Sequence, residues 1–271
     1  MPLVSKFAGA FAPKLLVEHR RRRIALDLLG IPHGGAAAFR RTARLAAHVE
    51  RCRFDLWPDF LRRDLGRWLL IDVGANKGEF IDSVCALAPP AGIFAFEPLP
   101  ELRTALERAV ARHGQGQVIA AAVGDKAGSV RLNRTQKRKL SSVLEPRQSM
   151  HKHYRDSMSV VDRIDVPLTM LDKEIPADAV VGLLKIDVQG FEPQVLDGAR
   201  RTLARTAVVM MEINYTEHYA ASGQFEDVHD RLAGAGFRLS GVSCPHMSRG
   251  VPLWADAVYV SRQFEQRDAE Q

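Results

Sequence analysis

The chain has 271 residues, 46% of them hydrophobic and 26% charged, a balance that is typical of a globular protein and excludes the disordered, coiled-coil and collagen-like classes. The length fits one large α/β domain of about 200 residues with an appended segment. The net charge of +6 is uneven, because residues 1–68 hold 14 Lys and Arg against 6 Asp and Glu and the remainder is slightly acidic. Three scattered cysteines exclude a disulfide framework and predict a reducing, cytoplasmic location.

The first 67 residues predict a basic helical extension. Apolar residues recur every three or four positions over residues 4–16, which is the spacing of an amphipathic helix, and further helices are expected at 24–29 and 36–53. We expect the four arginines at 20–23 to form a solvated face, with phosphate groups or peripheral contact with an anionic membrane as the alternatives. Lysines interrupt the apolar stretch near the start, so neither a membrane span nor a signal peptide is expected.

From residue 68 onward, short apolar runs alternate with helical stretches, which is typical of βα units that build a parallel sheet. They predict a doubly wound, mostly parallel, seven-stranded α/β sheet within residues 68–262, followed by a polar tail at 263–271. The expected strands are 68–73, 92–96, 117–122, 180–188, 207–213, 237–242 and 255–260, and the expected helices are 78–88, 100–113, 193–203 and 226–235.

One interval, residues 124–179, is too long for an ordinary connection between a strand and a helix. Its segments 129–133 and 163–169 alternate apolar and polar residues, which predicts an added strand pair. Between them, residues 134–156 form a basic loop, and long loops in compact domains are functional lids or disordered segments more often than neutral connections.

The strongest local signal is the apolar run 69–73 with the glycine turn that follows it and opens a helix. Gly74 and Gly78 let the backbone approach a ligand closely, and the helix N-terminus beyond presents free N–H groups, so a nucleotide-like ligand is expected here. Asn76 stands where the dinucleotide fingerprint requires a glycine. That residue disfavours an NAD(P)-dependent oxidoreductase, which remains an alternative because it shares this fold.

Acidic residues follow the next two expected strands. Glu97, with Pro98 beside it, stands at the end of the second strand, where a carboxylate can accept the hydroxyl protons of a ribose. Asp125 follows Gly124 after the third strand, where a polar side chain can reach an adenine edge. The structural alternatives are a helix N-terminal carboxylate for Glu97 and a turn-forming aspartate for Asp125.

Taken in order, these motifs resemble the FkbM-type methyltransferases, which are S-adenosylmethionine-dependent enzymes of the class I Rossmann-like fold. The resemblance covers roughly residues 68–242. It rests on the stretches 71–80, 96–98, 122–125, 141–142, 166–169 and above all 184–192, with the sequence LKIDVQGFE.

The resemblance implies a binding role for nine residues. Four of them surround the amino-acid end of S-adenosylmethionine, Glu97 holds the ribose hydroxyls next to Pro98, Gly124 and Asp125 lie near adenine, and the loop with Ser142 approaches the cofactor. The four at the amino-acid end are Asp72, Gly74, Asn76 and Gly78.

The resemblance also places Asp187 where the transferable methyl group points. An alcohol acceptor must lose a proton, which a carboxylate or an imidazole can take, and Asp187 is our first candidate for this base. Lys185 lies on the same side of its strand and is either a catalytic residue or a structural ion-pair partner. Further candidates for the base are Glu192, Glu212 and His218.

Metal binding is an open alternative for the same region. Asp187, Glu212 and Asn214 offer the oxygen ligands that Mg²⁺ prefers. The family usually has glutamate where Gln189 stands, which makes metal dependence less expected here, and we predict a site without a metal.

The predicted function is methylation of a hydroxyl on a sugar or a glycosylated secondary metabolite, an acceptor class that the resemblance implies. The partner is then a small molecule, and formation of a homo-oligomer stays open. The alternative is a nucleic-acid or membrane-surface binding protein on a Rossmann scaffold, suggested by the basic residues of 20–23 and 137–155. Nucleic acid is not expected, because no aromatic residues are interleaved with these basic runs.

Overall fold

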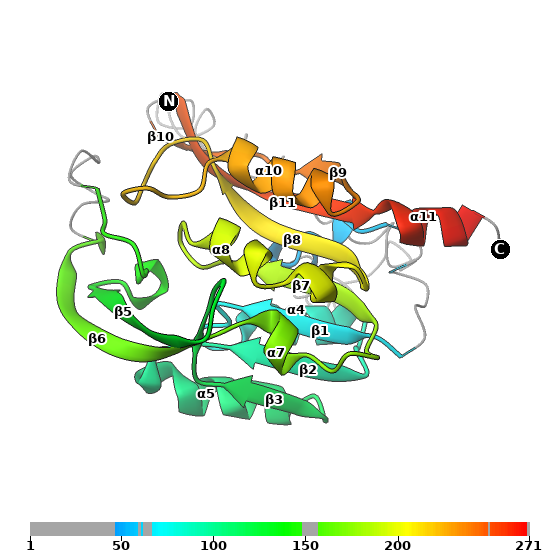
Figure 1. The fold of residues 1–271 in the computed structure, drawn as a ribbon, viewed down its shortest axis with the longest axis horizontal. Helices are drawn as coiled ribbons and strands as arrows, with labels where there is room; N and C mark the ends of the chain where they lie inside the picture. Colours follow the sequence, from blue (N-terminus) through cyan, green and yellow to red (C-terminus); the bar gives the residue numbers. More distant parts are fainter. Residues whose placement is uncertain (1–46, 59–60, 62–66, 148–156, 249, 270–271) are drawn as a thin grey trace, which may run out of the picture.

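The computed structural model describes residues 47–58, 61, 67–147, 157–248 and 250–269. This part of the chain is built on an eight-stranded sheet in the order β10-β11-β8-β7-β1-β2-β3, with β9 also paired to β11 (Figure 1). The strands are β1 (Leu69–Val73), β2 (Gly92–Phe96), β3 (Gly116–Ile119), β7 (Val181–Ile186), β8 (Thr206–Asn214), β9 (Phe237–Val242), β10 (His246–Ser248) and β11 (Val251–Ser261).

The centre of this sheet is parallel. Strand β1 pairs in parallel with β2 and β7, β2 with β3, and β7 with β8, whereas β11 runs antiparallel to β8, β9 and β10. The mostly parallel sheet predicted from the sequence is therefore confirmed. The carboxyl ends of β1, β2 and β7 meet at one edge, where the strand order reverses, and this is the position at which open α/β sheets bind ligands.

Helices cover both faces of the sheet because the strand residues alternate between two cores. On β8, Val208 and Met210 join the first core, whereas Val209 and Met211 join the second. The first core is closed by α4 (Glu79–Leu87) and α5 (Pro100–Ala111), and the second by α7 (Leu171–Glu174), α8 (Glu192–Asp197), α9 (Arg200–Leu203) and α10 (Phe225–Gly234). The arrangement is doubly wound, as predicted.

A second, three-stranded sheet departs from the expected pattern. The apolar run expected as one strand at 117–122 divides: β3 belongs to the main sheet, and β4 (Ala122–Val123) pairs with β6 (Val160–Thr169). Strand β6 also pairs antiparallel with β5 (Gly128–Thr135), so segments 129–133 and 163–169 are neighbours. Buried leucines on β5 and β6 pack against Leu99 and Leu102, which attaches this sheet to the end of β2 and the start of α5.

The end of the N-terminal extension packs on the first core. Residues 47–51 are helical, and a 3₁₀ turn, η1 (Phe54–Leu56), follows. Cys52, Phe54 and Trp57 are buried against that face of the sheet. The helices expected at 4–16 and 24–29, and the arginines at 20–23, lie outside the described residues.

The C-terminal segment that we expected to be a polar tail contains a helix, α11 (Arg262–Ala269). It continues from β11, and Arg238 of β9 forms an ion pair with Glu265 on it. Among the described helices, none is both long enough and apolar enough to span a membrane.

Candidate active site

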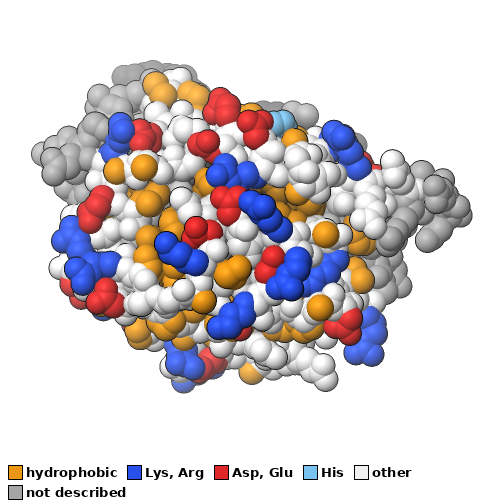
Figure 2. Space-filling view, viewed as in Figure 1, with side chains coloured by type: hydrophobic (Ala, Val, Ile, Leu, Met, Phe, Trp, Pro, Cys, Tyr) orange, Lys and Arg blue, Asp and Glu red, His pale blue; other side chains and the backbone are white. Residues whose placement is uncertain are grey.

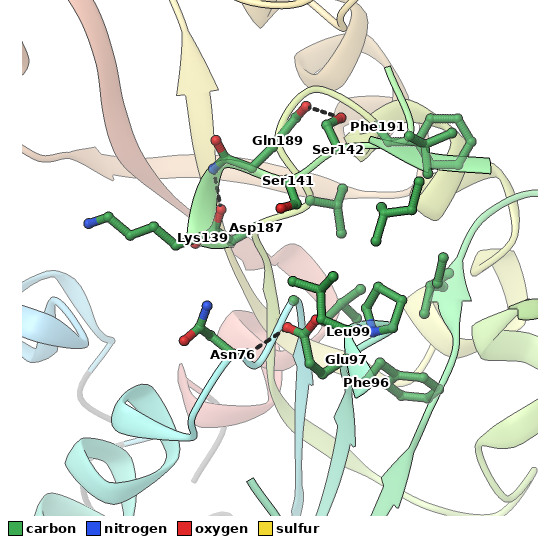
Figure 3. A pocket seen from close by; sticks show the side chains of 18 of the residues that line it. Asn76, Phe96, Glu97, Leu99, Lys139, Ser141, Ser142, Asp187, Gln189 and Phe191 are labelled. Atoms are coloured by element: carbon green, nitrogen blue, oxygen red, sulfur yellow. Dashed lines mark hydrogen bonds between the residues drawn. The ribbon is translucent and has the colours of Figure 1, made fainter. Parts of the chain in front are cut away.

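A pocket lies at the carboxyl ends of β1, β2 and β7 (Figure 3). Its lining comes from the turn after β1, the end of β2, β4, the loop after β7 and residues 138–143 of the insertion. Six of the predicted site residues line it: Gly74, Asn76, Glu97, Pro98, Ser142 and Asp187.

The glycine turn after β1 forms one wall of the pocket. Gly74 has φ of +79°, and a Cβ there would lie 1.9 Å from the backbone oxygen of Asp187, so only glycine lets the turn contact the end of β7. Gly78 lies outside the pocket lining. A Cβ at Gly78 would lie 2.4 Å from Cβ of Ala109, so its role is to let α4 pack on α5, and the predicted ligand contact is wrong.

Glu97 connects this turn to the end of β2. Its Oε2 accepts a hydrogen bond from the backbone N–H of Asn76 and its Oε1 accepts one from that of Leu99, each at 2.9 Å. The side chain is 7% exposed, and burial raises the pKa of its carboxyl to about 7. Each carboxylate oxygen can accept a further hydrogen bond, so Glu97 can receive hydroxyl groups from the pocket.

Beyond Glu97 the pocket is apolar. The side chains that line this part are aliphatic, apart from the ring of Phe191, which suits a flat heterocycle rather than a charged group. They belong to Leu99, Ala122, Val123, Leu132, Val143 and Phe191.

Gly124 and Asp125 do not line the pocket, and Asp125 is exposed. Because the expected third strand ends early and re-forms as β4, the chain passes the pocket at residues 121–123 and has left it by Asp125. The pocket lining therefore gives no support to the predicted adenine contact of these two residues.

Ser142 is part of the pocket wall, but its hydroxyl is already engaged. Its Oγ donates a hydrogen bond to the backbone oxygen of Gln189 at 2.8 Å and accepts one from the N–H of Leu144 at 3.0 Å. Ser142 therefore fastens the insertion to the loop after β7.

Asp72 and Lys185 form a buried ion pair outside the pocket lining. Lys185 Nζ lies 3.1 Å from Asp72 Oδ1, donates to the backbone oxygen of Gly74 at 3.1 Å, and lies 3.5 Å from Asp187 Oδ2. Burial raises the pKa of Asp72, with the charge of Lys185 opposing it. Burial lowers the pKa of Lys185, but the charges of Asp72 and Asp187 outweigh it and raise that pKa overall, so the ammonium stays protonated.

This geometry corrects two predictions. Asp72 is fully buried and cannot touch a ligand, and Lys185 cannot act as a base. Both hold the glycine turn against the end of β7, which is the structural alternative that the sequence left open for Lys185.

Asp187 is the one candidate base in the pocket lining of the described residues. Its side chain is 38% exposed, and its Oδ1 accepts a hydrogen bond from Gln189 Nε2 at 2.8 Å. Glu212, Glu192 and His218 lie outside the lining.

Glu192 and His218 are buried, and Glu212 is half-buried. Burial and then the charges of Asp187 and Glu192 raise the pKa of Glu212 well above its usual value. Burial raises the pKa of Glu192 to about 7, and Oε1 of that residue caps the N–H groups of Val188 and Gly190. Burial lowers the pKa of His218, so its imidazole is neutral. Direct contact of these residues with an acceptor does not fit the structure.

The described residues contain no group of three or more His, Cys, Asp or Glu side chains arranged to hold a metal ion. Of the ligand set considered from the sequence, Asp187 lines the pocket, whereas Glu212 and Asn214 do not.

The sequence reasoning missed part of the lining. Arg138, Lys139 and Val143 come from the insertion, and Phe191 and Gln189 from the loop after β7. The length and basic character of residues 134–156 were the only signal for the first group, and they could not show which residues of the loop reach the pocket.

The nucleic-acid alternative finds little support in the described surface. In Figure 2, Lys and Arg side chains are interspersed with Asp and Glu rather than gathered into a stripe. Arg131, Arg163 and Arg147 of the insertion each pair with a carboxylate. The basic residues at 20–23 and 151–155 lie outside the described residues.

Comparisons with known proteins agree with this site. A sequence profile described as the methyltransferase FkbM domain matches residues 72–239. The chain is 29% identical to 31-O-demethyl-FK506 methyltransferase FkbM of Streptomyces tacrolimicus, in an alignment of 194 residues that covers 63% of this chain and 73% of that protein.

Solved structures similar to the chain are also methyltransferases. One is a putative tRNA (m1A22) methyltransferase of Streptococcus pneumoniae, with a TM-score of 0.45, 13% identity and coverage of 78% of this chain and 72% of that one. Another is magnesium protoporphyrin IX methyltransferase of Synechocystis PCC 6803, with a TM-score of 0.43, 10% identity and coverage of 92% and 96%. Since the profile match spans more than half of the chain, the chain belongs to the FkbM family of S-adenosylmethionine-dependent methyltransferases.

Proposed function

We propose that the pocket binds S-adenosylmethionine and that the enzyme methylates a hydroxyl group of a sugar or a secondary metabolite. The observation that carries this proposal is that Glu97 and Asp187 face one pocket on either side of the Gly74 turn. Glu97 would hold the ribose hydroxyls, the apolar lining the adenine, and the Gly74 turn the amino-acid end.

Among the described lining residues, Glu97 and Asp187 carry the carboxyl groups and Arg138 and Lys139 the basic groups. The pocket therefore offers partners of both signs, which supports a ligand that combines a sulfonium and an ammonium with a carboxylate.

When bound, S-adenosylmethionine supplies an electrophilic methyl group. Asp187 accepts the proton that the acceptor hydroxyl releases. General-base catalysis of this kind raises the rate by about 10²- to 10⁴-fold. The pocket walls contribute by holding donor and acceptor in line.

The identity of the methyl acceptor is the more specific part of the proposal. Support comes from the name of the Streptomyces relative, which describes a methyltransferase of a 31-O-demethyl compound. The three cysteines are free thiols, which supports a reducing cytoplasm as the compartment of the enzyme. We propose a small-molecule acceptor rather than nucleic acid.

Titration calorimetry with S-adenosylmethionine and S-adenosylhomocysteine tests the cofactor, and release of S-adenosylhomocysteine across a panel of hydroxylated sugars and glycosides tests the acceptor. Asp187→Asn should lower turnover at least about 100-fold while cofactor affinity stays within about threefold, because it removes the base and keeps the shape. Asp165→Asn, at an exposed carboxylate of β6 that pairs with Arg131, is the matched control and should keep full turnover. Absence of cofactor binding by the unaltered protein would refute the proposal.

A further inference from the structure

Gln189 has an unusual backbone conformation at the edge of the pocket. Its φ is +58°, in the left-handed region that side chains other than Gly, Asn and Asp seldom adopt, and Gly190 follows with φ of +101°. The residue is 9% exposed and lines the pocket beside Asp187 (Figure 3). Conformations of this kind persist only where surrounding contacts hold them, and they cluster at functional sites.

The contacts of Gln189 fix both ends of its side-chain amide. Its Nε2 donates to Asp187 Oδ1 at 2.8 Å. Its Oε1 accepts from the hydroxyl of Tyr219 at 3.1 Å, and that hydroxyl also lies 2.8 Å from the backbone oxygen of Leu140. Because the Asp187 carboxylate can only accept, the Nε2 end of the amide must face it. The Tyr219 hydroxyl shares its single proton between Gln189 Oε1 and the Leu140 oxygen.

The backbone of Gln189 is held as well, since its oxygen accepts the hydrogen bond from Ser142 Oγ at 2.8 Å. Leu140 and Ser142 both belong to the insertion, and Tyr219 is 2% exposed in the loop after β8. Gln189 thus connects two segments that are far apart in sequence, the insertion and the loop after β8, to a single oxygen atom of Asp187.

We propose that Gln189 is a positioning residue that orients the Asp187 carboxylate toward the transferable group, an inference that rests on the proposed function. Lys185 Nζ lies 3.5 Å from Asp187 Oδ2 and attracts the carboxylate toward the pocket floor. The amide of Gln189 opposes that rotation by holding Oδ1. Without this hydrogen bond, the Asp187 carboxylate rotates toward the Lys185 ammonium and no longer points toward the space that the acceptor occupies.

Other charged or titratable groups also face Asp187, and of these the test below alters only Tyr219. They are Asp72 of β1, Lys185 of β7, Glu192 of α8, Glu212 of β8, Tyr219 of the loop after β8 and Asp256 of β11.

The test needs no acceptor. It compares the affinities of S-adenosylhomocysteine and sinefungin, an analogue that carries an amino group in place of the transferable methyl group. The unaltered protein should bind sinefungin about tenfold more tightly, because an aimed Asp187 carboxylate makes a charge-assisted hydrogen bond to that ammonium. Asp187→Asn should abolish the preference.

Gln189→Asn and Gln189→Met should each reduce the preference to about twofold or less while S-adenosylhomocysteine affinity stays within about threefold. Asn tolerates the left-handed backbone conformation, but its side chain is one methylene shorter than that of Gln and does not reach Asp187. Met has about the length of Gln but no hydrogen-bond donor. Tyr219→Phe should reduce the preference partly. The matched control is Tyr259→Phe, at a buried tyrosine of β11 whose hydroxyl lies 3.4 Å from His229 Nδ1, and it should leave the preference unchanged.

The outcomes separate the two proposals. If the unaltered protein binds neither compound, the proposed function fails, and this inference with it. If it binds both, and Asp187→Asn abolishes the preference while both Gln189 variants retain it, Gln189 does not position Asp187, although the proposed function stands. An equal loss of affinity for both compounds in the Gln189 variants would indicate a purely structural role and would also overturn the inference.

Discussion

Glu97 shows how a residue can serve a site at the expense of stability. Its carboxyl accepts two backbone hydrogen bonds, yet burial raises its pKa from 4.5 to about 7. Since ionisation is disfavoured in the folded state, the contribution of Glu97 to stability is complete below about pH 4.5 and is lost as the pH rises through about 7. The ionised form is the better acceptor for two ribose hydroxyls, so the form that suits the ligand is the less stable one.

Glu97→Gln should therefore unfold at nearly the same temperature as the unaltered protein at about pH 5 and at a higher temperature at about pH 8. The gain at the higher pH is at most about 3 kcal/mol, reduced by the new NH₂ group that faces a backbone amide. Thermal unfolding followed by circular dichroism at both pH values measures it. Glu107→Gln, at an exposed glutamate of α5, should show no such pH dependence. A lower unfolding temperature for Glu97→Gln at the higher pH would contradict this account.

At the scale of elements, the site depends on how closely the turn after β1 approaches the end of β7. The N–H of Asp187 donates to the backbone oxygen of Val73 at 3.0 Å, and Lys185 donates to the backbone oxygen of Gly74. The two strand ends are therefore held together by backbone groups and by one buried ammonium, with no space between them for a side chain.

Gly74→Ala should separate these strand ends and weaken S-adenosylhomocysteine binding at least about tenfold, because its Cβ would overlap the oxygen of Asp187. Gly114→Ala is the matched control, since Gly114 also has positive φ, at +97°, but has no atom within 4 Å of the added Cβ. The control should lose only about 1 kcal/mol of stability and keep its affinity. Calorimetry and urea unfolding of both variants measure the difference. Equal effects would show that backbone strain rather than the close approach matters.

At the scale of the whole molecule, the end of the extension is part of the domain. Trp57 is 1% exposed in the first core, and its Nε1 donates to the backbone oxygen of Cys52 at 2.8 Å. Arg53 Nε donates to Asp256 Oδ2 at 2.8 Å, and Asp256 lies opposite Glu212 on β8. Residues that precede β1 in sequence thus cover one face of the sheet and balance one charge near the site.

Trp57→Ala should destabilise the whole domain by about 3 to 5 kcal/mol, the usual effect of removing a large buried aromatic side chain. The loss should appear in one cooperative transition during urea unfolding. Trp254→Ala, which removes a partly exposed indole stacked on His246, is the control and should cost less. A separate early transition in Trp57→Ala would instead mean that the extension folds apart from the sheet.

Most of the sheet could be predicted because a βα unit is a local pattern. The runs at 68–73, 92–96 and 180–188 are mostly apolar, as is typical of strands buried on both faces, and each contains an observed strand. The run at 117–122 is equally apolar, and nothing within it marks the point at which it leaves the main sheet. Its division depends on β6, a partner about forty residues later in the chain.

The sequence by itself determined where the parallel strands lie along the chain, the glycine turn, and the acids Glu97 and Asp187 at the strand ends, because these follow from neighbouring residues and from the period of a strand. Only the tertiary structure decided that Asp72 and Lys185 neutralise each other below the pocket, that Asp125 lies outside it, and that Gln189 and Tyr219 connect Asp187 to the insertion. Burial, charge pairing and hydrogen bonding between distant segments depend on distances in space, which residue order does not contain.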